Sequence, residues 1–318
     1  MAQQDAATIV RPLTLDWVGR HLEVGERVIG AEALHGGITA EMRKLIVGTR
    51  GGVVRHLVVR SFVESFALRY AEDWLHRESR ALRMLAGTGL PAPGLIAVDS
   101  TAAYCEYPSL LMTHMPGRTV LVDEGLETRV PLMARQLVAI HALRTIDRPR
   151  EYQTLTTADT VVMLPRANEE VWAAAIDVIR RPAPPFEGRI LHRDFQPGNV
   201  LFDVPGSAST QITGVVDWAG MAWGPADFDV AHCSTNLALL HGPEWGLRFA
   251  TEYDKAGGVL SETARERQYW RVRDALACSG ELQLWAQPWR EAGRADLTER
   301  VVEDRLDTYI SIVMSAQA

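Results

Sequence analysis

The chain has 318 residues, of which 47% are apolar, and it carries a formal net charge of −7 at pH 7. No run approaches the ~18 apolar residues of a membrane span, residues 1–12 lack the basic and apolar segments of a secretory signal, and the acidic balance disfavours nucleic acid as a partner. Its three widely spaced cysteines are typical of reduced thiols. We therefore expect a cytoplasmic protein with one two-lobed unit or two domains, bound to neither membrane nor nucleic acid.

The first third of the chain is predicted to be rich in β-strands. The expected strands cover residues 28–34, 42–47, 53–60, 95–98 and 110–113. Glycines are expected to turn the chain between the first two strands at Gly36-Gly37 and before the third strand at residues 50–52. A short helix over residues 14–24, with Thr14 as its N-cap, is expected to precede these strands.

A helix predicted over residues 69–86 carries an acid inside its apolar stripe. The apolar side chains of this helix fall on one face, and Glu78 lies among them. Because an unpaired buried carboxylate is costly, Glu78 needs a cationic partner.

A Met-Pro-Gly sequence at residues 115–117 breaks the chain, and the part that follows is predicted to be mainly helical. We place a strand-rich lobe at residues 1–112, a hinge at 113–117 and a helical lobe at 118–318. One long helix is expected over residues 261–286.

The most informative segment is His192-Arg193-Asp194-Phe195-Gln196-Pro197-Gly198-Asn199, followed eighteen residues later by Asp217. Phosphoryl transfer uses an Asp that orients a hydroxyl and takes its proton, together with hard oxygen ligands for Mg²⁺. Asp194, Asn199 and Asp217 match these requirements and are the predicted catalytic residues. Asn199 and Asp217 are the candidate metal ligands.

Chance is a poor explanation of this spacing, because the composition gives roughly 0.005 expected matches to His-x-Asp-x4-Asn. Short apolar strands are predicted on both sides of the segment, at residues 190–191 and 200–202, and a third strand through 212–216 leads to Asp217. A turn between buried strands that carries acid and amide side chains is typical of a catalytic loop. A capped structural loop is the alternative.

With these motifs the chain resembles the aminoglycoside phosphotransferase family, which are small-molecule kinases of the protein-kinase-like fold, over about residues 28–240. The strongest likeness lies in residues 192–202, 215–218 and 224–231, the last of which matches the family pattern Gly-Asp-Pro-Ala-x-Asp-Leu-Ala with its first Asp missing. The resemblance implies an α+β, bilobal fold with a small β-rich N-lobe and a larger, mainly helical C-lobe. It also implies transfer of the γ-phosphoryl group of ATP or GTP, with Mg²⁺, to a hydroxyl of a small molecule, often an antibiotic.

The resemblance assigns roles to residues of the helical lobe. Asp194 would be the base, and Asn199 and Asp217 would hold Mg²⁺. His192 would support the loop by packing and hydrogen bonding, and Asp229 would brace it from the start of the next helix.

The resemblance also implies contacts to a nucleotide between the lobes. The strand over residues 53–60 ends in Arg60 where the family commonly has Lys, and this Arg would pair with Glu78 and with phosphates. The exchange fits a chain with 31 arginines and only two lysines. One of the lysines, Lys44, is the rival cation, but it has no evident matching acid and is expected at the surface. The residues predicted to contact the nucleotide are Gly36, Gly37, Thr39, Arg60, Glu78, Thr113 and Met115.

Two features argue against a protein substrate. Asp229 follows Asp217 by only twelve positions, which is too short for the activation segment of protein kinases. Trp218-Ala219 also stands where those kinases have Phe-Gly after their metal-binding Asp.

The acceptor side is predicted from acids that lie near aromatic residues. Trp270, Asp274, Glu281 and Trp285 are spaced to share one face of the helix over residues 261–286. Such a face could hold a ligand with amine or sugar groups, and a solvated acidic face with packed indole rings is the alternative. The candidate substrate residues are Asp227, Asp274 and Glu281.

We predict an enzyme, a small-molecule O-phosphotransferase with antibiotic resistance as a candidate role. A kinase of a metabolic sugar or amino alcohol is one alternative, and a nucleotide-binding protein without turnover is another. The presence of Asp194, Asn199 and Asp217 together favours an enzyme.

Overall fold

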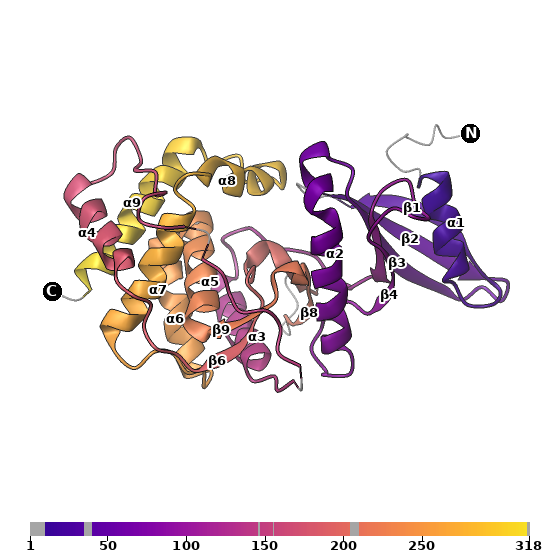
Figure 1. Ribbon diagram of the computed structural model, residues 1–318, viewed down its shortest axis with the longest axis horizontal. Coiled ribbons are helices and arrows are strands. Elements are labelled where there is room, and N and C mark those ends of the chain that lie inside the picture. The colour runs from indigo at the N-terminus through magenta and orange to yellow at the C-terminus, as the bar shows by residue number, and fades with distance from the viewer. Residues whose placement is uncertain (1–9, 35–39, 146, 155, 204–209, 317–318) are drawn as a thin grey trace. The chain divides into compact units, whose positions relative to one another are not determined.

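The computed structural model describes residues 10–34, 40–145, 147–154, 156–203 and 210–316. The chain forms two compact units, one up to Pro116 and the other from Gly117 onward (Figure 1). No helix within the described ranges is long and apolar enough to cross a membrane.

The first unit is built on a five-stranded antiparallel sheet with the strand order β1-β2-β3-β5-β4. The strands are β1 (Glu26–Leu34), β2 (Glu41–Thr49), β3 (Val54–Ser61), β4 (Leu95–Asp99) and β5 (Ser109–Thr113). The helices are α1 (Pro12–Arg20) and α2 (Ser65–Leu85). Trp17 and Val18 of α1 pack in one apolar cluster with Leu45, Leu57 and Leu111 of the three central strands, while α2 contacts β4 and β5 (Figure 1).

Helix α1 differs from the predicted helix over residues 14–24. It begins at Pro12, whose fixed φ suits the first helical position, and it ends at Arg20. The prediction of Thr14 as its N-cap is wrong, because Thr14 lies inside the helix and donates from N–H and Oγ to Glu106 at 2.9 and 2.7 Å. This partner is far away in sequence, so local residue patterns could not reveal it.

The second unit is mainly helical. Its helices are α3 (Leu126–His141), α4 (Glu169–Arg180), α5 (Ala226–His241), α6 (Pro243–Lys255), α7 (Ala264–Ala277), α8 (Leu282–Glu291) and α9 (Glu299–Ser315). Two small antiparallel sheets pair β6 (Gly188–Leu191) with β9 (Ala222–Pro225) and β7 (Val200–Phe202) with β8 (Ile212–Val215). Every residue of α5 is buried, and this helix contacts α6, α7 and α9 (Figure 1). The predicted α+β class, strand-rich first and mainly helical afterwards, is confirmed.

The single helix predicted over residues 261–286 is wrong, because α7 and α8 are separated by a turn at residues 278–281. The hydroxyl of Ser279 donates to a carbonyl in the last turn of α7 at 2.8 Å. A serine that bonds the backbone and a following glycine both favour the end of a helix over its interior. Glu281 therefore precedes α8 and does not continue the face that carries Trp270.

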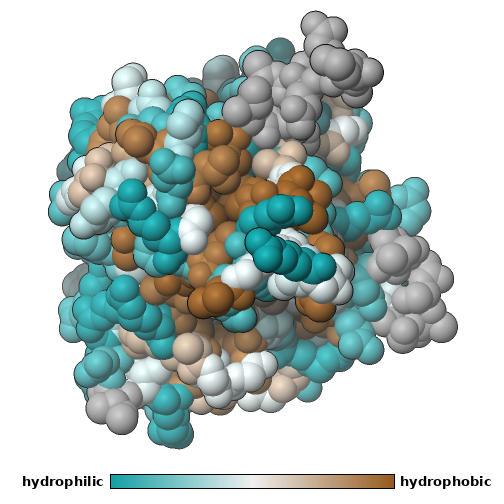
Figure 2. All heavy atoms as spheres, turned by 90° about the vertical axis from the view of Figure 1, so that its right-hand side faces the viewer, coloured by the Kyte–Doolittle hydropathy of each residue, from teal (hydrophilic) through white to brown (hydrophobic). Residues whose placement is uncertain are grey.

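Several large apolar side chains are exposed on the first unit. Val24, Ile29, Val53 and Val54 are each exposed by half or more. Figure 2 shows a face on which apolar atoms in brown gather near the centre, with hydrophilic atoms in teal around them. Much of any protein surface is apolar, so these exposed residues do not by themselves indicate a binding partner.

The three cysteines are buried free thiols. Burial raises the pKa of Cys105 to about 12 and raises the pKa values of Cys233 and Cys278 well above their usual range. All three are therefore neutral thiols near pH 7.

Candidate active site

The predicted catalytic loop joins strands of two different sheets. It follows β6 at His192, closes in a short 3₁₀ turn, η2 (Pro197–Asn199), and continues into β7. Because β7 pairs with β8, the chain returns beside the loop, and the Val216 N–H donates to the Asn199 carbonyl at 3.0 Å. This pairing brings Asp217, the next residue, to the end of the loop that holds Asn199.

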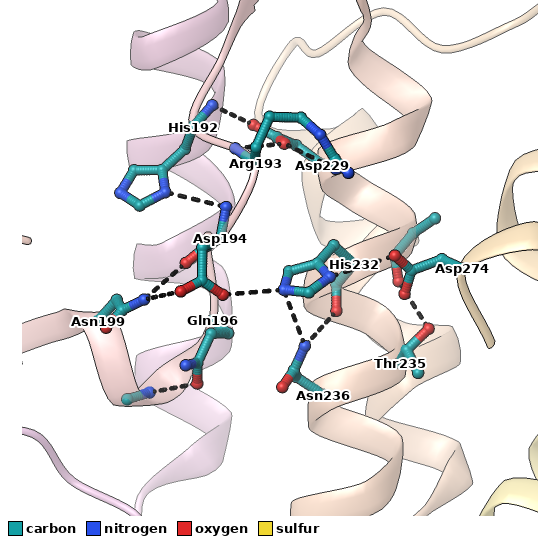
Figure 3. Close-up of polar contacts among 12 residues, drawn as sticks. His192, Arg193, Asp194, Gln196, Asn199, Asp229, His232, Thr235, Asn236 and Asp274 are labelled. Atoms are coloured by element: carbon teal, nitrogen blue, oxygen red, sulfur yellow. Dashed lines mark hydrogen bonds and ion pairs between the residues drawn. The ribbon is translucent and has the colours of Figure 1, made fainter. Parts of the chain in front are cut away.

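Asp194 lies in this loop with a hydrogen-bond partner on each carboxylate oxygen (Figure 3). Asn199 Nδ2 donates to Oδ2 at 2.7 Å and to the Asp194 backbone carbonyl at 2.9 Å. His232 Nε2 lies 3.1 Å from Oδ1. Burial opposes ionisation, but the hydrogen bond and the charge of His232 hold the pKa of Asp194 below its usual value. The side chain is still 42% exposed, so an ionised carboxylate is accessible to a ligand.

His192 is fully buried, and its contacts determine its tautomer. Nε2 lies 3.1 Å from the Val216 carbonyl, which can only accept, so Nε2 carries a hydrogen. Nδ1 accepts from the Asp194 N–H at 3.2 Å. Burial lowers the pKa of His192, which agrees with a neutral ring. Both ring nitrogens are used to hold the loop, as a supporting residue requires.

Asp229, in the first turn of α5, binds the backbone of the same loop at His192 and Arg193 (Figure 3). Its two oxygens accept the N–H groups of His192 at 2.6 Å and of Arg193 at 2.9 Å. His141 Nε2 lies 3.3 Å from Oδ2. Burial opposes ionisation of Asp229, but the hydrogen bond from His141 and the nearby positive charges outweigh it and lower its pKa to about 2. The brace is therefore an ionised carboxylate.

Two residues of the site have backbones in the left-handed region. Arg193 has a φ of 74°, and Asp217 has φ 63° and ψ 68°. Such conformations cost about 1–3 kcal/mol for residues other than glycine and persist only where their surroundings hold them. At Arg193 the surroundings include the hydrogen bond to Asp229 and the ring of Phe228, whose centroid lies 3.6 Å from the guanidinium carbon.

Asn199 and Asp217 offer oxygen atoms that suit a hard divalent cation. Since Nδ2 of Asn199 is committed to Asp194, its amide presents Oδ1 for a further contact. Within the residues that the structure describes, no cluster of three or more His, Cys, Asp or Glu could hold a metal ion. Mg²⁺ nevertheless fits this donor set, because it commonly takes one or two protein oxygens and completes its shell with water and phosphates.

The first unit contains the predicted ion pair. Arg60 of β3 donates from Nη1 to Oε2 of Glu78 on α2 at 2.9 Å, and Glu78 is only 2% exposed. Lys44, the rival cation, lies 3.1 Å from Glu32 across β1 and β2. The expectation that Lys44 lacks a matching acid is therefore wrong, because the cross-strand register supplies one.

The remaining residues predicted to contact a nucleotide are only partly described. The Thr113 N–H donates to the Gly94 carbonyl at 2.9 Å, so a base could pair at Thr113 through its carbonyl alone. Met115 follows β5, in the predicted hinge. The predicted residues Gly36, Gly37 and Thr39 lie outside the described residues.

Residues 31–276 match the family model described as the phosphotransferase enzyme family, APH. The chain belongs to this family. No curated protein sequence matches the chain.

Solved structures of phosphotransferases share the fold of this chain. A thermostable mutant of aminoglycoside phosphotransferase APH(4)-Ia is similar with a TM-score of 0.60 and 18% identity, over 95% of this chain and 99% of that one. Aminoglycoside-3'-phosphotransferase of type VIII gives 0.54 and 24%, over 82% and 98%. Macrolide 2'-phosphotransferase MphH from Brachybacterium faecium gives 0.55 and 18%, over 92% and 97%. The APH chain thus has the protein-kinase-like fold that the family resemblance implied.

The residues predicted to bind the acceptor have different surroundings in this APH chain. Asp227 is buried in the first turn of α5, where its Oδ2 accepts from the N–H and hydroxyl of Ser261 at 2.9 and 3.1 Å. Glu281 is exposed just before α8. Asp274 of α7 is buried and lies 3.2 Å from His232 Nδ1. Only Asp274 among these three shares a described hydrogen-bond network with Asp194.

His232 and Asn236 are site residues that the sequence analysis missed. Both lie on α5, three and seven residues after Asp229, so the three side chains share one helix face. That spacing was a usable signal, but it does not reveal that the loop at Asp194 lies against this face.

A cavity of about 1100 Å³ lies elsewhere in the second unit. Residues around Tyr152, Arg181 and Arg273 line it, and none of the predicted catalytic residues does. Arg273 there donates to the carbonyls of Thr156 at 2.7 Å and Ile179 at 3.4 Å, so it ties a loop to α4.

Proposed function

We propose that this APH chain moves the γ-phosphoryl group of ATP or GTP to a hydroxyl of a small molecule, with aminoglycosides and other antibiotics as the first acceptor candidates. The observation that carries the proposal is the Asp194 carboxylate, which is partly exposed and hydrogen-bonded on both oxygens. It lies in a loop that also presents Asn199 and leads to Asp217.

Relatives in fold support the choice of donor and acceptor. APH(4)-Ia was solved in a ternary complex with ADP and hygromycin B, and aminoglycoside 2'-phosphotransferase-IIIa was solved with GDP. Another relative is macrolide 2'-phosphotransferase type I. These names cover two nucleotides and two classes of hydroxylated antibiotic.

The chemistry we derive for this chain centres on Asp194. Its carboxylate accepts a hydrogen bond from the acceptor hydroxyl, orients the oxygen for attack and takes the proton as the new P–O bond forms, while the bond from the γ-phosphorus to the β–γ bridging oxygen breaks and the nucleoside diphosphate leaves. Because Asn199 and His232 fix the carboxylate, its orientation is set before the acceptor binds, which lowers the entropic cost of attack.

Other residues of the chain serve the phosphates. Asn199 Oδ1 and the Asp217 carboxylate would hold Mg²⁺, and the bound ion would neutralise charge on the phosphates. We assign Arg60 to the phosphates as well, held in place by Glu78. Thr113 and Met115 would meet the base through their backbones.

We predict that Asp194→Asn reduces acceptor-dependent release of nucleoside diphosphate by at least about 10³-fold, because the amide cannot take the proton. Nucleotide affinity should change less than about twofold. The measurement is diphosphate release from Mg²⁺-ATP and Mg²⁺-GTP with aminoglycosides, macrolides and simple amino alcohols, together with nucleotide titration by calorimetry. Asp177→Asn, on the exposed surface of α4, is the matched control and should behave as the wild type.

The panel also separates the alternatives. Release with amino alcohols alone would favour a metabolic kinase over an antibiotic kinase. Nucleotide binding without release for any acceptor would support a protein that binds without turnover. Full activity of Asp194→Asn would exclude Asp194 as the base.

A further inference from the structure

The imidazole of His232 lies between two carboxylates from different parts of the second unit (Figure 3). Nε2 lies 3.1 Å from Asp194 Oδ1 in the loop, and Nδ1 lies 3.2 Å from Asp274 Oδ1 on α7. An ionised carboxylate only accepts hydrogen bonds, so each ring nitrogen must donate to make its contact. His232 is therefore an imidazolium when both contacts exist.

The two other residues that contact the ring of His232, Asn236 and Trp285, carry no charge. Asn236, one turn later on α5, donates from Nδ2 to the His232 carbonyl at 2.9 Å, and that nitrogen lies 3.2 Å from Nε2. The ring of Trp285 packs edge-on with a centroid distance of 5.5 Å. Burial disfavours the charge on the ring, but Asp274 and Asp194 outweigh it and raise the pKa of His232 to about 10.

His241 on the same helix shows what happens without this arrangement. It is buried and lies 2.6 Å from Asp123, but Arg294 binds the same carboxylate oxygen at 3.0 Å. Its Nε2 has no described hydrogen-bond partner. Burial, with the neighbouring arginines, lowers the pKa of His241 to about 4. Two histidines of one helix thus differ in charge, because burial is opposed by two carboxylates at His232 and by only one, shared with Arg294, at His241.

The contact between His232 and Asp194 adds a constraint on the carboxylate that the loop alone does not supply. Asn199 belongs to the same loop as Asp194, whereas His232 belongs to the buried helix α5. Donors on both carboxylate oxygens, from two elements, fix the plane of the group, and lone pairs remain on its exposed side. Asp274 in turn fixes the ring, because its Oδ1 accepts from Nδ1.

We propose that His232, fixed by Asp274, is a positioning residue for phosphoryl transfer, which locks the Asp194 carboxylate in the orientation that receives the acceptor's proton. The inference rests on the proposed function only in its catalytic part. The ion pair itself can be tested whether or not an acceptor is known.

Two substitutions of His232 distinguish a role in orienting Asp194 from a role in packing alone. The amide nitrogen of Gln can reach the place of Nε2 and still donate to Asp194, whereas that of Asn reaches only the place of Nδ1, beside Asp274. We expect His232→Asn to lower kcat by about 10²-fold, since misplaced catalytic groups cost that much, and His232→Gln to lower it by less than about tenfold. The KM for nucleotide should stay within about twofold in both. His241→Asn is the matched control and should leave kcat unchanged.

Equal losses of kcat in His232→Asn and His232→Gln, or no loss in either, would overturn the positioning role. Protein stability is checked by thermal melting of each variant. If a variant does not fold, ¹⁵N NMR of the histidine rings in the wild-type protein tests the inference instead. At pH 7 we expect both nitrogens of His232 to be protonated and only one of His241.

The NMR result also separates this inference from the proposed function. A neutral His232 would overturn the inference even if the enzyme is active. A charged His232 that loses a proton in Asp274→Asn would support the ion pair even if no acceptor is phosphorylated, in which case the proposed function alone would fail.

Discussion

Asp229 accepts hydrogen bonds from two consecutive backbone N–H groups, and the second of these belongs to Arg193, whose φ is positive. Asp229 is fully buried, so it accepts these two N–H groups away from the protein surface. A buried donor without a partner costs about 1–3 kcal/mol. The backbone conformation of the catalytic loop therefore depends on one side chain of α5.

We predict that Asp229→Asn lowers the free energy of unfolding by about 2–4 kcal/mol, because the amide supplies one acceptor where two are needed. Urea denaturation of both proteins measures this difference. Asp227→Asn is the control: burial raises the pKa of Asp227, so a neutral amide is a closer substitute there, and we expect a smaller loss. Equal losses in the two variants would contradict the bracing role.

The stabilisation of the folded protein by Asp229 should also depend on pH. Its pKa in the folded protein is about 2, below the ordinary value of 3.8, so its ionisation favours the folded state. The stabilisation is fully present above about pH 4 and is lost as pH falls towards 2. We expect the gap in unfolding free energy between wild type and Asp229→Asn to narrow over that interval and to be flat from pH 5 to 8. If the difference in unfolding free energy instead widened on acidification, ionisation of Asp229 would not stabilise the folded protein.

The sequence alone could predict residues whose role follows from their spacing to nearby residues. The spacing of Asp194 and Asn199 is local, and the acid in the stripe of α2 signalled a buried pair, which the Arg60 contact confirms. The spacing of His232 from Asp229 indicates a shared helix face, but it does not reveal that the charge of His232 depends on Asp194 and Asp274, 38 and 42 residues away along the chain. Long-range electrostatic contacts leave no trace in local spacing.

At the scale of elements, strands were predicted more closely than helix ends. Alternating apolar residues and glycine turns constrain a strand on both sides, so the sheet of the first unit follows its predicted ranges closely. Apolar spacing continues across the turn between α7 and α8, so periodicity alone joined two helices into one.

Helix α6 crosses α5 at a glycine, and this crossing makes a testable prediction. A Cβ at Gly246 would lie 2.5 Å from the Ser234 carbonyl oxygen and 2.8 Å from Cβ of Ala238. We expect Gly246→Ala to destabilise the protein by about 1–3 kcal/mol, since overpacking outweighs the gain in helix propensity. Gly19→Ala on α1 is the matched control, because a Cβ there meets nothing within 4 Å, and it should stabilise by about 0.5–1 kcal/mol. Thermal or urea unfolding measures both, and a gain in stability for Gly246→Ala would contradict the close packing.

At the scale of the whole molecule, the predicted nucleotide and catalytic residues belong to different units of the chain. Substitutions in the first unit should therefore change the KM for nucleotide, whereas substitutions at Asp194 should change proton transfer. We predict that Glu78→Gln raises the KM for Mg²⁺-nucleotide several-fold, because Arg60 loses the charge that holds it. Glu72→Gln, at an exposed position of the same helix, is the control. Unchanged kinetics in Glu78→Gln would remove the Arg60–Glu78 pair from the proposed nucleotide site.

The buried cysteines make the native protein a convenient background for site-specific labelling. A thiol reagent attacks the thiolate form, and burial keeps Cys105, Cys233 and Cys278 both protonated and out of reach. A maleimide probe should therefore leave the folded wild-type protein unmodified and should react with a single cysteine introduced at an exposed position. Pairs of such labels, one in each unit, would let fluorescence energy transfer follow the distance between the units as nucleotide and acceptor bind.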